Sequence, residues 1–399
     1  MKLQLTKDKT IDVKMPWEKP SAGGTAGRCA GPSDVTGVFL DMSDARGCPA
    51  VRLQRRKGEI HVVAAGFVPR PDGALPNSWD DLRDQVKWSL PHAFQSSQAA
   101  LAVYSPDMFI RQTTVDALTS AETSPAAPVA PTKKKLGVRR DPAPQPQEKE
   151  TKPASAVSAP VPFVPVSHDG NRFVIAPLDE NQFILQAGLP EYQVLWLSRL
   201  LPEGHRPTAC SVQVAPAAML SALHSQPDFV AADGTAMAVF VTRNSVYFAG
   251  YRKGALLLFR ECPGAAGYEV MRELVKTGLG VTDEMVDSIL DGTLIDPRPA
   301  LEPLVRPVLQ QLKLSMDYLA QRYDVHVDKV FLMGLPTGAH YWKSFAEEVL
   351  GVPFVSPDAF AGFRQLVKGV QLPNDMTAGA SHAYLAALGA ARAAMEGHG

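Results

Sequence analysis

The sequence predicts an α/β protein with two related halves, and three segments carry this prediction. Residues 328–360 read as a buried strand, a glycine-bounded turn and a helix, an order that places ligands at the carboxyl end of the strand. Residues 35–69 and 236–262 each read as three consecutive strands, with a Lys-Gly pair joining the second strand to the third. Because this pattern occurs twice, we expect duplicated structural units.

In the first copy, an apolar strand at 38–40 runs into a polar turn that begins with Asp41 and includes Ser43. Strands at 50–55 and 59–68 follow, and Lys57-Gly58 forms the tight turn between them.

In the second copy, a strand at 239–241 runs into the turn Thr242-Arg243-Asn244. The next two strands are predicted at 245–251 and 255–262, joined by Lys253-Gly254. The two copies therefore agree in order and in turn chemistry.

A helix is predicted after each meander. Over residues 78–94, Ser78 is a suitable N-cap, and four apolar side chains share one face: Trp79, Leu82, Val86 and Leu90. Further helices are predicted over 267–277, 282–290, 301–322 and 381–395, together with one that ends at Leu350-Gly351.

Residues 172–214 read as a smaller α/β unit. We expect a strand at 173–176, a helix over 180–187 that continues as 191–201, and a strand at 209–214. Its apolar face is supplied by Phe183, Ile184, Val194, Leu195 and Leu201.

Together these motifs resemble the actin-like, ribonuclease-H-type superfamily, and within it the PilM family of type IV pilus assembly proteins. The resemblance covers most of the chain outside 1–34 and 120–170. It implies an α/β, actin-like two-lobed fold built from duplicated βββαβα (ribonuclease-H-like) halves with a small inserted α/β subdomain. The implied parts are a first half at 35–119, the subdomain at 171–225, and a second half with its closing helix at 226–397.

In this family, an Asp-x-Gly turn in each half holds phosphate, and a late Gly-Gly turn packs against the adenosine. The resemblance therefore implies ATP with Mg²⁺ as the cofactor, and Asp41 as the residue that would hold the metal through water. The implied cofactor-binding positions are Asp41, Ser43, Thr242, Asn244, Gly334, Thr337 and Gly338.

All three turns depart from the family pattern. Ser43 and Asn244 stand where glycine would let backbone N–H groups approach a phosphate, and Thr242 replaces the second carboxylate. Pro336 removes one backbone donor from the third turn. Arg243 either meets a phosphate or stays solvated. We therefore expect a degenerate nucleotide site and no enzymatic activity.

Composition limits the other function classes. The 399 residues are 45% hydrophobic, enough for a large core, and the net charge of −1 gives no basic field for nucleic acid. The four cysteines, Cys29, Cys48, Cys210 and Cys262, form no C-x-x-C pair and are expected to be free thiols. Without a signal peptide or an apolar run long enough to span a membrane, the chain is expected to be cytoplasmic and to reach the membrane through a partner.

Two segments lack the periodicity of packed structure. Residues 1–34 are expected to be a disordered tail, and 120–170 a Pro/Ala-rich linker. The basic cluster of the linker, Lys133–Lys135 with Arg139 and Arg140, either contacts a membrane or an acidic partner, or belongs to a solvated tether.

The predicted function is that of a PilM-like scaffold in a type IV pilus or type II secretion-like assembly. In the family, such a scaffold holds the cytoplasmic tail of a bitopic membrane partner, and here residues 172–214 are the expected docking unit. Two alternatives come from other classes. One is a nucleotide-binding actin-like ATPase or a sugar kinase, and the other is a structural module that forms a homo-oligomer.

Overall fold

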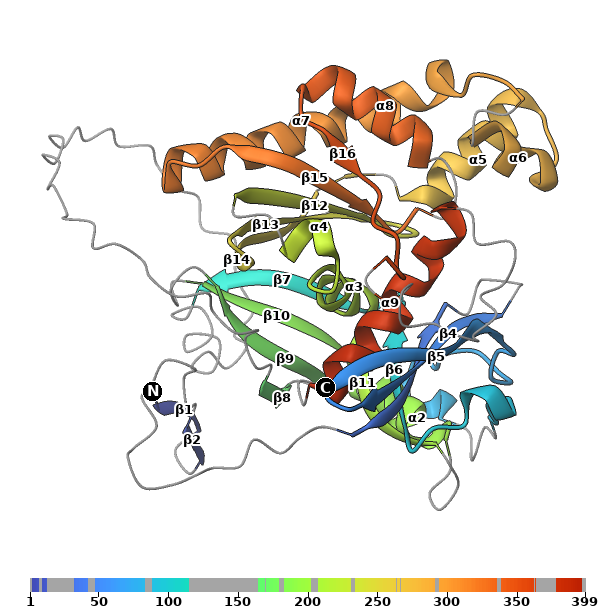
Figure 1. The fold of residues 1–399 in the computed structure, drawn as a ribbon, viewed down its shortest axis with the longest axis vertical. Coiled ribbons are helices and arrows are strands. Elements are labelled where there is room, and N and C mark those ends of the chain that lie inside the picture. Colours follow the sequence, from blue (N-terminus) through green and yellow to red (C-terminus); the bar gives the residue numbers. More distant parts are fainter. Residues whose placement is uncertain are drawn as a thin grey trace, which may run out of the picture.

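The structure is a computed structural model. It describes residues 2–6, 9–12, 32–41, 47–82, 88–114, 164–168, 170–178, 183–201, 207–230, 234–262, 264–265, 267–290, 294–335, 339–361, 363 and 378–396. In these ranges, the strands form two five-stranded sheets, one four-stranded sheet and one two-stranded hairpin. Figure 1 shows the two larger sheets in separate lobes, with helices between them and beyond the second sheet.

The first large sheet has the strand order β11-β6-β3-β4-β5. Strand β3 pairs antiparallel with β4, and β4 pairs antiparallel with β5, as the meander predicts. On its other side β3 pairs parallel with β6, which in turn pairs parallel with β11. The bounds are β3 Asp34–Leu40, β4 Cys48–Arg56, β5 Glu59–Val68, β6 Gln98–Val103 and β11 Thr208–Val214.

The second large sheet repeats this arrangement with the order β14-β13-β12-β15-β16. Here β12 pairs antiparallel with β13 and parallel with β15, and β16 lies parallel to β15. The bounds are β12 Thr235–Val241, β13 Val246–Arg252, β14 Ala255–Glu261, β15 Val327–Met333 and β16 Phe354–Val355. When the strands of each sheet are numbered 1 to 5 along the chain, both sheets have the order 3-2-1-4-5. The predicted duplication therefore extends to all five strands.

The two Lys-Gly hairpins have the same backbone conformation. Lys57 and Gly58 have φ of 52° and 88°, and Lys253 and Gly254 have φ of 49° and 77°. Two successive left-handed residues are the requirement of the tight turn that matches the twist of paired strands. This local signal explains why the meanders could be predicted in register.

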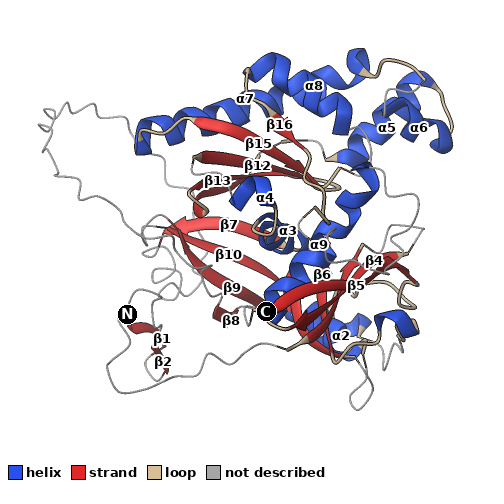
Figure 2. Ribbon diagram, in the orientation of Figure 1, coloured by secondary structure: helices blue, strands red, loops and turns tan. Residues whose placement is uncertain are grey.

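The second sheet separates two hydrophobic cores. Along β12, Met237, Val239 and Val241 belong to one core, whereas Ala236, Ala238 and Phe240 belong to the other. The first of these cores is completed by α5 (Tyr268–Leu279), α6 (Asp283–Leu290), α7 (Arg298–Tyr323) and α8 (Ala339–Leu350). Figure 2 shows these four helices together at one side of the second lobe. The other core is shared with the first lobe.

The closing helix α9 (Ala378–Met395) follows the second half in sequence but packs on the sheet of the first lobe. It crosses β3 at Gly37 and lies against α3 (Ala215–Leu223) at Gly389. A Cβ atom at Gly37 would overlap the carbonyl oxygen of Ala387 in α9, and one at Gly389 would overlap the carbonyl oxygen of Ala218 in α3. Glycine therefore permits direct backbone contact at both crossings.

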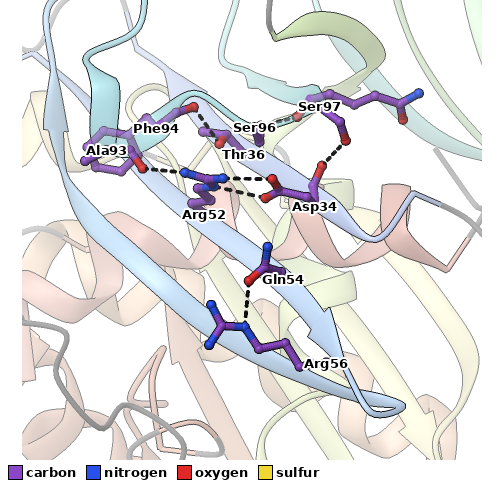
Figure 3. A network of polar contacts seen from close by, with 10 residues as sticks. Asp34, Thr36, Arg52, Gln54, Arg56, Ala93, Phe94, Ser96 and Ser97 are labelled. Carbon is purple, nitrogen blue, oxygen red and sulfur yellow. Dashed lines mark hydrogen bonds and ion pairs between the residues drawn. The ribbon is translucent and has the colours of Figure 1, made fainter.

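Polar contacts fix the start of β3 (Figure 3). Arg52 of β4 donates from Nε and Nη2 to the two carboxylate oxygens of Asp34, at 2.9 and 2.8 Å. Thr36 donates to the carbonyl of Phe94, and Ser97 donates to that of Asp34. These bonds join β3 and β4 to the segment that leads into β6.

The small sheet differs from the predicted unit. Its order is β7-β10-β9-β8, with every pair antiparallel. The bounds are β7 Phe109–Thr114, β8 Val164–His168, β9 Asn171–Leu178 and β10 Phe183–Pro190, and helix α2 spans Glu191–Arg199. The predicted helix over 180–187 is wrong where residues are described, because β10 pairs there with strands on both sides. The predicted strand at 209–214 exists as β11, but it belongs to the first large sheet.

Two further predictions need correction. Over 78–94 the described residues form short 3-10 turns at Trp79–Asp81 and His92–Phe94, and residues 88–91 are not helical. At the N-terminus, β1 (Lys2–Thr6) pairs with β2 (Lys9–Asp12), where a disordered tail was expected. Residues 120–163 of the predicted linker lie outside the described residues. No helix in the described ranges is long and apolar enough to cross a membrane.

Candidate functional site

The candidate site lies where the first and fourth strands of each half end. Asp41 directly follows β3 and Thr242 directly follows β12, so the two occupy equivalent positions in the two halves. Tyr104 follows β6 and Gly334 follows β15, and they form the second equivalent pair. Because strands one and four of each half are parallel neighbours, their carboxyl ends meet at the same edge.

Side chains from the two halves meet at this edge. Nη1 of Arg243 lies 3.8 Å from Oδ1 of Asp41, and its Nη2 lies 3.3 Å from Oε2 of Glu269. The Tyr104 hydroxyl is hydrogen-bonded to the Thr242 side chain and to the backbone of Asn244. Burial raises the pKa of Tyr104, and these two hydrogen bonds partly oppose the shift. The phenol therefore stays neutral and links the first half to the turn of the second.

The turn from Thr242 to Ser245 satisfies much of its own polarity. The Thr242 N–H donates to the Ser245 carbonyl at 2.8 Å, and the Ser245 N–H donates to the Thr242 hydroxyl oxygen at 3.0 Å. The Thr242 hydroxyl in turn donates to the Ser245 carbonyl at 2.8 Å. Threonine thus acts as a turn cap here, a local role that its short side chain suits.

Helix α5 begins directly against this turn. The N–H groups of Tyr268 and Glu269 donate to the carbonyls of Thr242 and Arg243, at 3.0 and 3.1 Å. Gly267 makes the approach possible, since a Cβ atom there would overlap the Arg243 carbonyl. The first N–H groups of a helix are a ready anion site when they are open, but these two are already used within the chain.

Gly334 has a packing role at the end of β15. Its φ of 88° lies in the left-handed region, and a Cβ atom there would overlap the carbonyl oxygen of Val241. The glycine therefore lets the ends of β15 and β12 lie in direct contact. This requirement holds whether or not a ligand is bound.

The predicted site residues divide into two groups. Asp41, Thr242, Asn244 and Gly334 come together as the duplication implies. Ser43, Thr337 and Gly338 lie outside the described residues.

Sequence reasoning missed two members of the site, Tyr104 and Glu269. Tyr104 could have been found by extending the comparison of the halves to the fourth strand, where it matches Gly334. No local signal marks Glu269, which reaches Arg243 only through the packing of α5 on the turn.

The described side chains do not fit a magnesium nucleotide. Metal-bound ATP needs unopposed carboxylates for Mg²⁺ and open backbone donors for the phosphates. Here Asp41 faces a guanidinium, Thr242 caps its own turn, and the nearby helix donors are used. No group of three or more His, Cys, Asp or Glu in the described part of the chain could hold a metal ion.

Comparison with known proteins identifies the fold. No family model matches the sequence, and no curated protein matches it either. A solved PilM-PilN type IV pilus biogenesis complex is similar over 90% of this chain and 98% of that chain, with a TM-score of 0.54 and 14% identity. A Bacteroides thetaiotaomicron protein with an actin-like ATPase fold also matches over 83% and 93% of the two chains, with a TM-score of 0.36 and 9% identity. The first of these similarities shows that the chain shares the fold of that solved complex, in agreement with the two-lobed actin-like fold that the sequence predicts.

Proposed function

We propose that this chain is a PilM-like scaffold that holds the cytoplasmic tail of a bitopic membrane protein in a type IV pilus or type II secretion-like assembly. In this proposal the former nucleotide position is taken by the chain's own side chains. Two observations support it. The architecture matches the PilM-PilN complex over almost the full length of both chains. The guanidinium of Arg243 lies beside Asp41, the carboxylate that would hold the metal.

The Arg243 contact explains how the junction can persist without nucleotide. In an actin-like ATPase, Mg²⁺ and phosphates neutralise and bridge the groups of the two halves. Here a guanidinium from the second half neutralises Asp41 of the first, and the Tyr104 hydroxyl adds a hydrogen bond across the same junction. Such partly exposed ion pairs contribute only about 0–1 kcal/mol, so this contact orients the lobes more than it stabilises the fold.

We expect the purified protein to hydrolyse ATP at background rate and to bind Mg·ATP with a Kd weaker than about 1 mM, a binding free energy below roughly 4 kcal/mol. The reason is that the metal carboxylate and the phosphate donors are engaged within the chain. Isothermal titration calorimetry and a phosphate-release assay measure both quantities. Asp41→Ala should change neither the hydrolysis rate nor the Kd. The control Asp283→Ala, on the exposed surface of α6, should also leave both unchanged.

Micromolar Mg·ATP binding that is abolished by Asp41→Ala and preserved in Asp283→Ala would contradict the prediction that the nucleotide site is degenerate. It would favour the alternative of a nucleotide-binding ATPase or sugar kinase of the same fold.

Within residues 172–214, we propose one strand as the place where the tail docks. Strands β9 and β10 are each paired on both sides, so neither can accept another strand. Among the described strands, β11 is the edge strand of the first large sheet that lies within 172–214, and β16 is its equivalent in the second sheet. Because an edge strand offers unpaired N–H and C=O groups to an extended peptide, we place the docking site along β11.

Docking along β11 predicts a selective effect of Val212→Lys. A charged side chain on this half-buried edge position should weaken binding of the tail at least tenfold, about 1.4 kcal/mol. The probe is a fluorescein-labelled peptide with the cytoplasmic tail of the single-span membrane protein proposed as the partner, and its binding is measured by fluorescence anisotropy. Val355→Lys on β16 is the matched control, since it makes the same change at a half-buried valine of the equivalent edge strand.

Equal affinity in the two variants, with both folded, would exclude β11 as the docking edge. Failure of the unmodified protein to bind the tail would count against the scaffold function itself.

A further inference from the structure

A groove of about 460 Å³ lies between the small sheet and the second large sheet. One wall is β7 of the small sheet, and the other is β14 of the second sheet. Figure 1 shows these two strands as neighbours, and they are in contact. The groove is lined by Ile110, Arg111, Gln112, Thr113, Phe183, Leu258, Phe259, Arg260 and Glu261.

Both walls are edge strands. Among the described strands, β7 pairs only with β10, and β14 pairs only with β13. The two edges do not pair with each other, and the Phe259 N–H instead donates to the side-chain oxygen of Gln112 at 3.4 Å. This long bond reaches a side chain, and no ladder of main-chain hydrogen bonds joins the two described edges. The groove therefore presents main-chain polar groups of the kind that an added strand would satisfy.

Two arginines of the groove are held in place by neutral groups. Nε of Arg111 donates to the Gln186 side-chain oxygen at 2.7 Å, and its guanidinium lies 5.3 Å from the centre of the Phe109 ring. In the same way, Nη2 of Arg260 donates to the Gln311 side-chain oxygen at 2.7 Å, and its guanidinium lies over Phe248.

Neither arginine forms an ion pair with a carboxylate among the described residues, and Nε of Arg260 is buried there without a hydrogen-bond partner. The groove's own carboxylate, Glu261, accepts a hydrogen bond from the Ser245 hydroxyl at 2.8 Å. Two ordered guanidinium groups beside apolar surface thus remain without an opposite charge. An ordered guanidinium is well suited to meet a carboxylate, which it can bind through two hydrogen bonds.

We propose that this groove binds an extended acidic peptide segment of a partner protein. The segment adds along the edge of β7 or β14, its carboxylates meet Arg111 and Arg260, and its apolar side chains contact Phe183 and Leu258. Main-chain hydrogen bonds supply affinity and the charged pairs supply selectivity, the general logic of strand addition. This site goes beyond the proposed function, because the groove is separate from β11 and its occupant need not be the membrane tail.

The walls belong to different parts of the fold, so the occupant would bridge them. Strand β7 is part of the sheet inserted into the first half, whereas β14 belongs to the second half. A bound segment would hold the two in one relative arrangement.

The test selects peptides from a displayed library of random heptamers on the full-length protein, without any assumption about the partner. Selected sequences are then synthesised with fluorescein, and their Kd values are measured by anisotropy. We expect apolar residues alternating with Asp or Glu, and slower hydrogen exchange in β7 and β14 on binding. We expect Arg111→Glu and Arg260→Gln each to weaken binding at least tenfold.

Arg306→Glu is the matched control. Arg306 is an exposed arginine of α7 whose guanidinium also lies over a ring, that of Phe345, and it does not line the groove. It should leave the Kd unchanged. Because Arg111 is exposed, its variant remains informative even if Arg260→Gln disturbs packing around Gln311.

Three results would overturn the proposal. One is a consensus without acidic residues, and another is an affinity unchanged in both groove variants. The third is that no peptide is selected while inorganic phosphate binds and depends on Arg111, which would make the groove a site for small anions.

Discussion

Replacing Gly389 by alanine is expected to destabilise the protein by about 3 kcal/mol or more, at the upper end of what overpacking costs. The added methyl group would overlap the Ala218 carbonyl oxygen and lie 2.9 Å from the Ala222 nitrogen, both in the backbone of α3. No side chain can rotate away, so α9 and α3 would have to separate. A loss of this size is a large part of the total stability of a typical protein.

Urea denaturation followed by tryptophan fluorescence measures this effect. The matched control is Gly278→Ala in α5, where a Cβ atom would have no neighbour within 4 Å. There, alanine should stabilise the helix by about 0.5–1 kcal/mol, because it removes the flexibility of glycine without a clash. If Gly389→Ala leaves the urea midpoint unchanged or raises it, the backbone contact at Gly389 is not tight.

The same crossing explains how the two lobes are tied together. Helix α9 ends the sequence of the second half, but most of its contacts are with β3, β4, β6 and α3 of the first lobe. Its buried face is mostly alanine, which allows close approach: Ala386, Ala387, Ala390, Ala391 and Ala394. The C-terminal element therefore closes the N-terminal sheet, and the first lobe cannot be completed until the whole chain is present.

The repeated meanders were predictable because their signals are local. The Lys-Gly turns require left-handed backbone, and the apolar strands between them are short and bounded. Residues 183–190 gave no such signal, since the short apolar run Phe183–Leu185 fits a strand or a helix equally well. The segment forms a strand because it pairs with β7 on one side and β9 on the other. Such pairing between separate segments cannot be inferred from the local sequence.

The helix predicted over 78–94 is absent from the described residues for a similar reason. Apolar spacing there favoured a helix, but the Trp88 side chain donates to the Pro69 carbonyl at 2.8 Å. Its backbone N–H donates to the Leu200 carbonyl at 3.3 Å instead of to a preceding turn. Tertiary hydrogen bonds thus replace the helical ones, as often happens where propensity is weak.

The candidate site was predictable in position and not in chemistry. Asp41 and Thr242 were found because each follows the first strand of its half. For Arg243 the sequence allows either a phosphate contact or a solvated side chain, because its carboxylate partners, Asp41 and Glu269, are not its neighbours in sequence. The sequence shows that the second carboxylate is replaced by Thr242. Only the fold shows that the guanidinium of Arg243 lies beside the remaining carboxylate, Asp41.

Acid is expected to destabilise the lobe junction through His224, which follows α3. Its ring lies edge-on to Phe229 and Tyr251, with centres at 5.1 and 5.9 Å. The pKa of His224 is lowered from 6.5 to about 4, mainly by burial and also by nearby Arg392 of α9, while Glu396 partly opposes the shift. Phe229 also contacts Phe331 of β15, so this aromatic cluster joins helices of the first lobe to the second sheet.

The sign of the pH effect follows from the lowered pKa. Above pH 6.5 the imidazole is neutral in both the folded and the unfolded protein, and it has no effect. Between pH 6.5 and about 4 the unfolded chain gains a proton that the folded protein does not, so stability falls by about 1.4 kcal/mol per unit. The full loss is about 3 kcal/mol, of which about 2 kcal/mol should appear by pH 5.

Urea denaturation at pH 7 and pH 5 tests this with His224→Gln. The variant should be less stable at pH 7 because it loses ring contacts, but its further loss on going to pH 5 should be about 2 kcal/mol smaller than that of the unmodified protein. His326→Gln, at an exposed position before β15, is the control and should keep the full acid response. Carboxylates also titrate in acid, and comparing the variants at the same two pH values removes their shared contribution. If unmodified protein and His224→Gln lose equal stability, the imidazole takes up its proton without leaving the aromatic cluster, and acid acts on this junction through other groups.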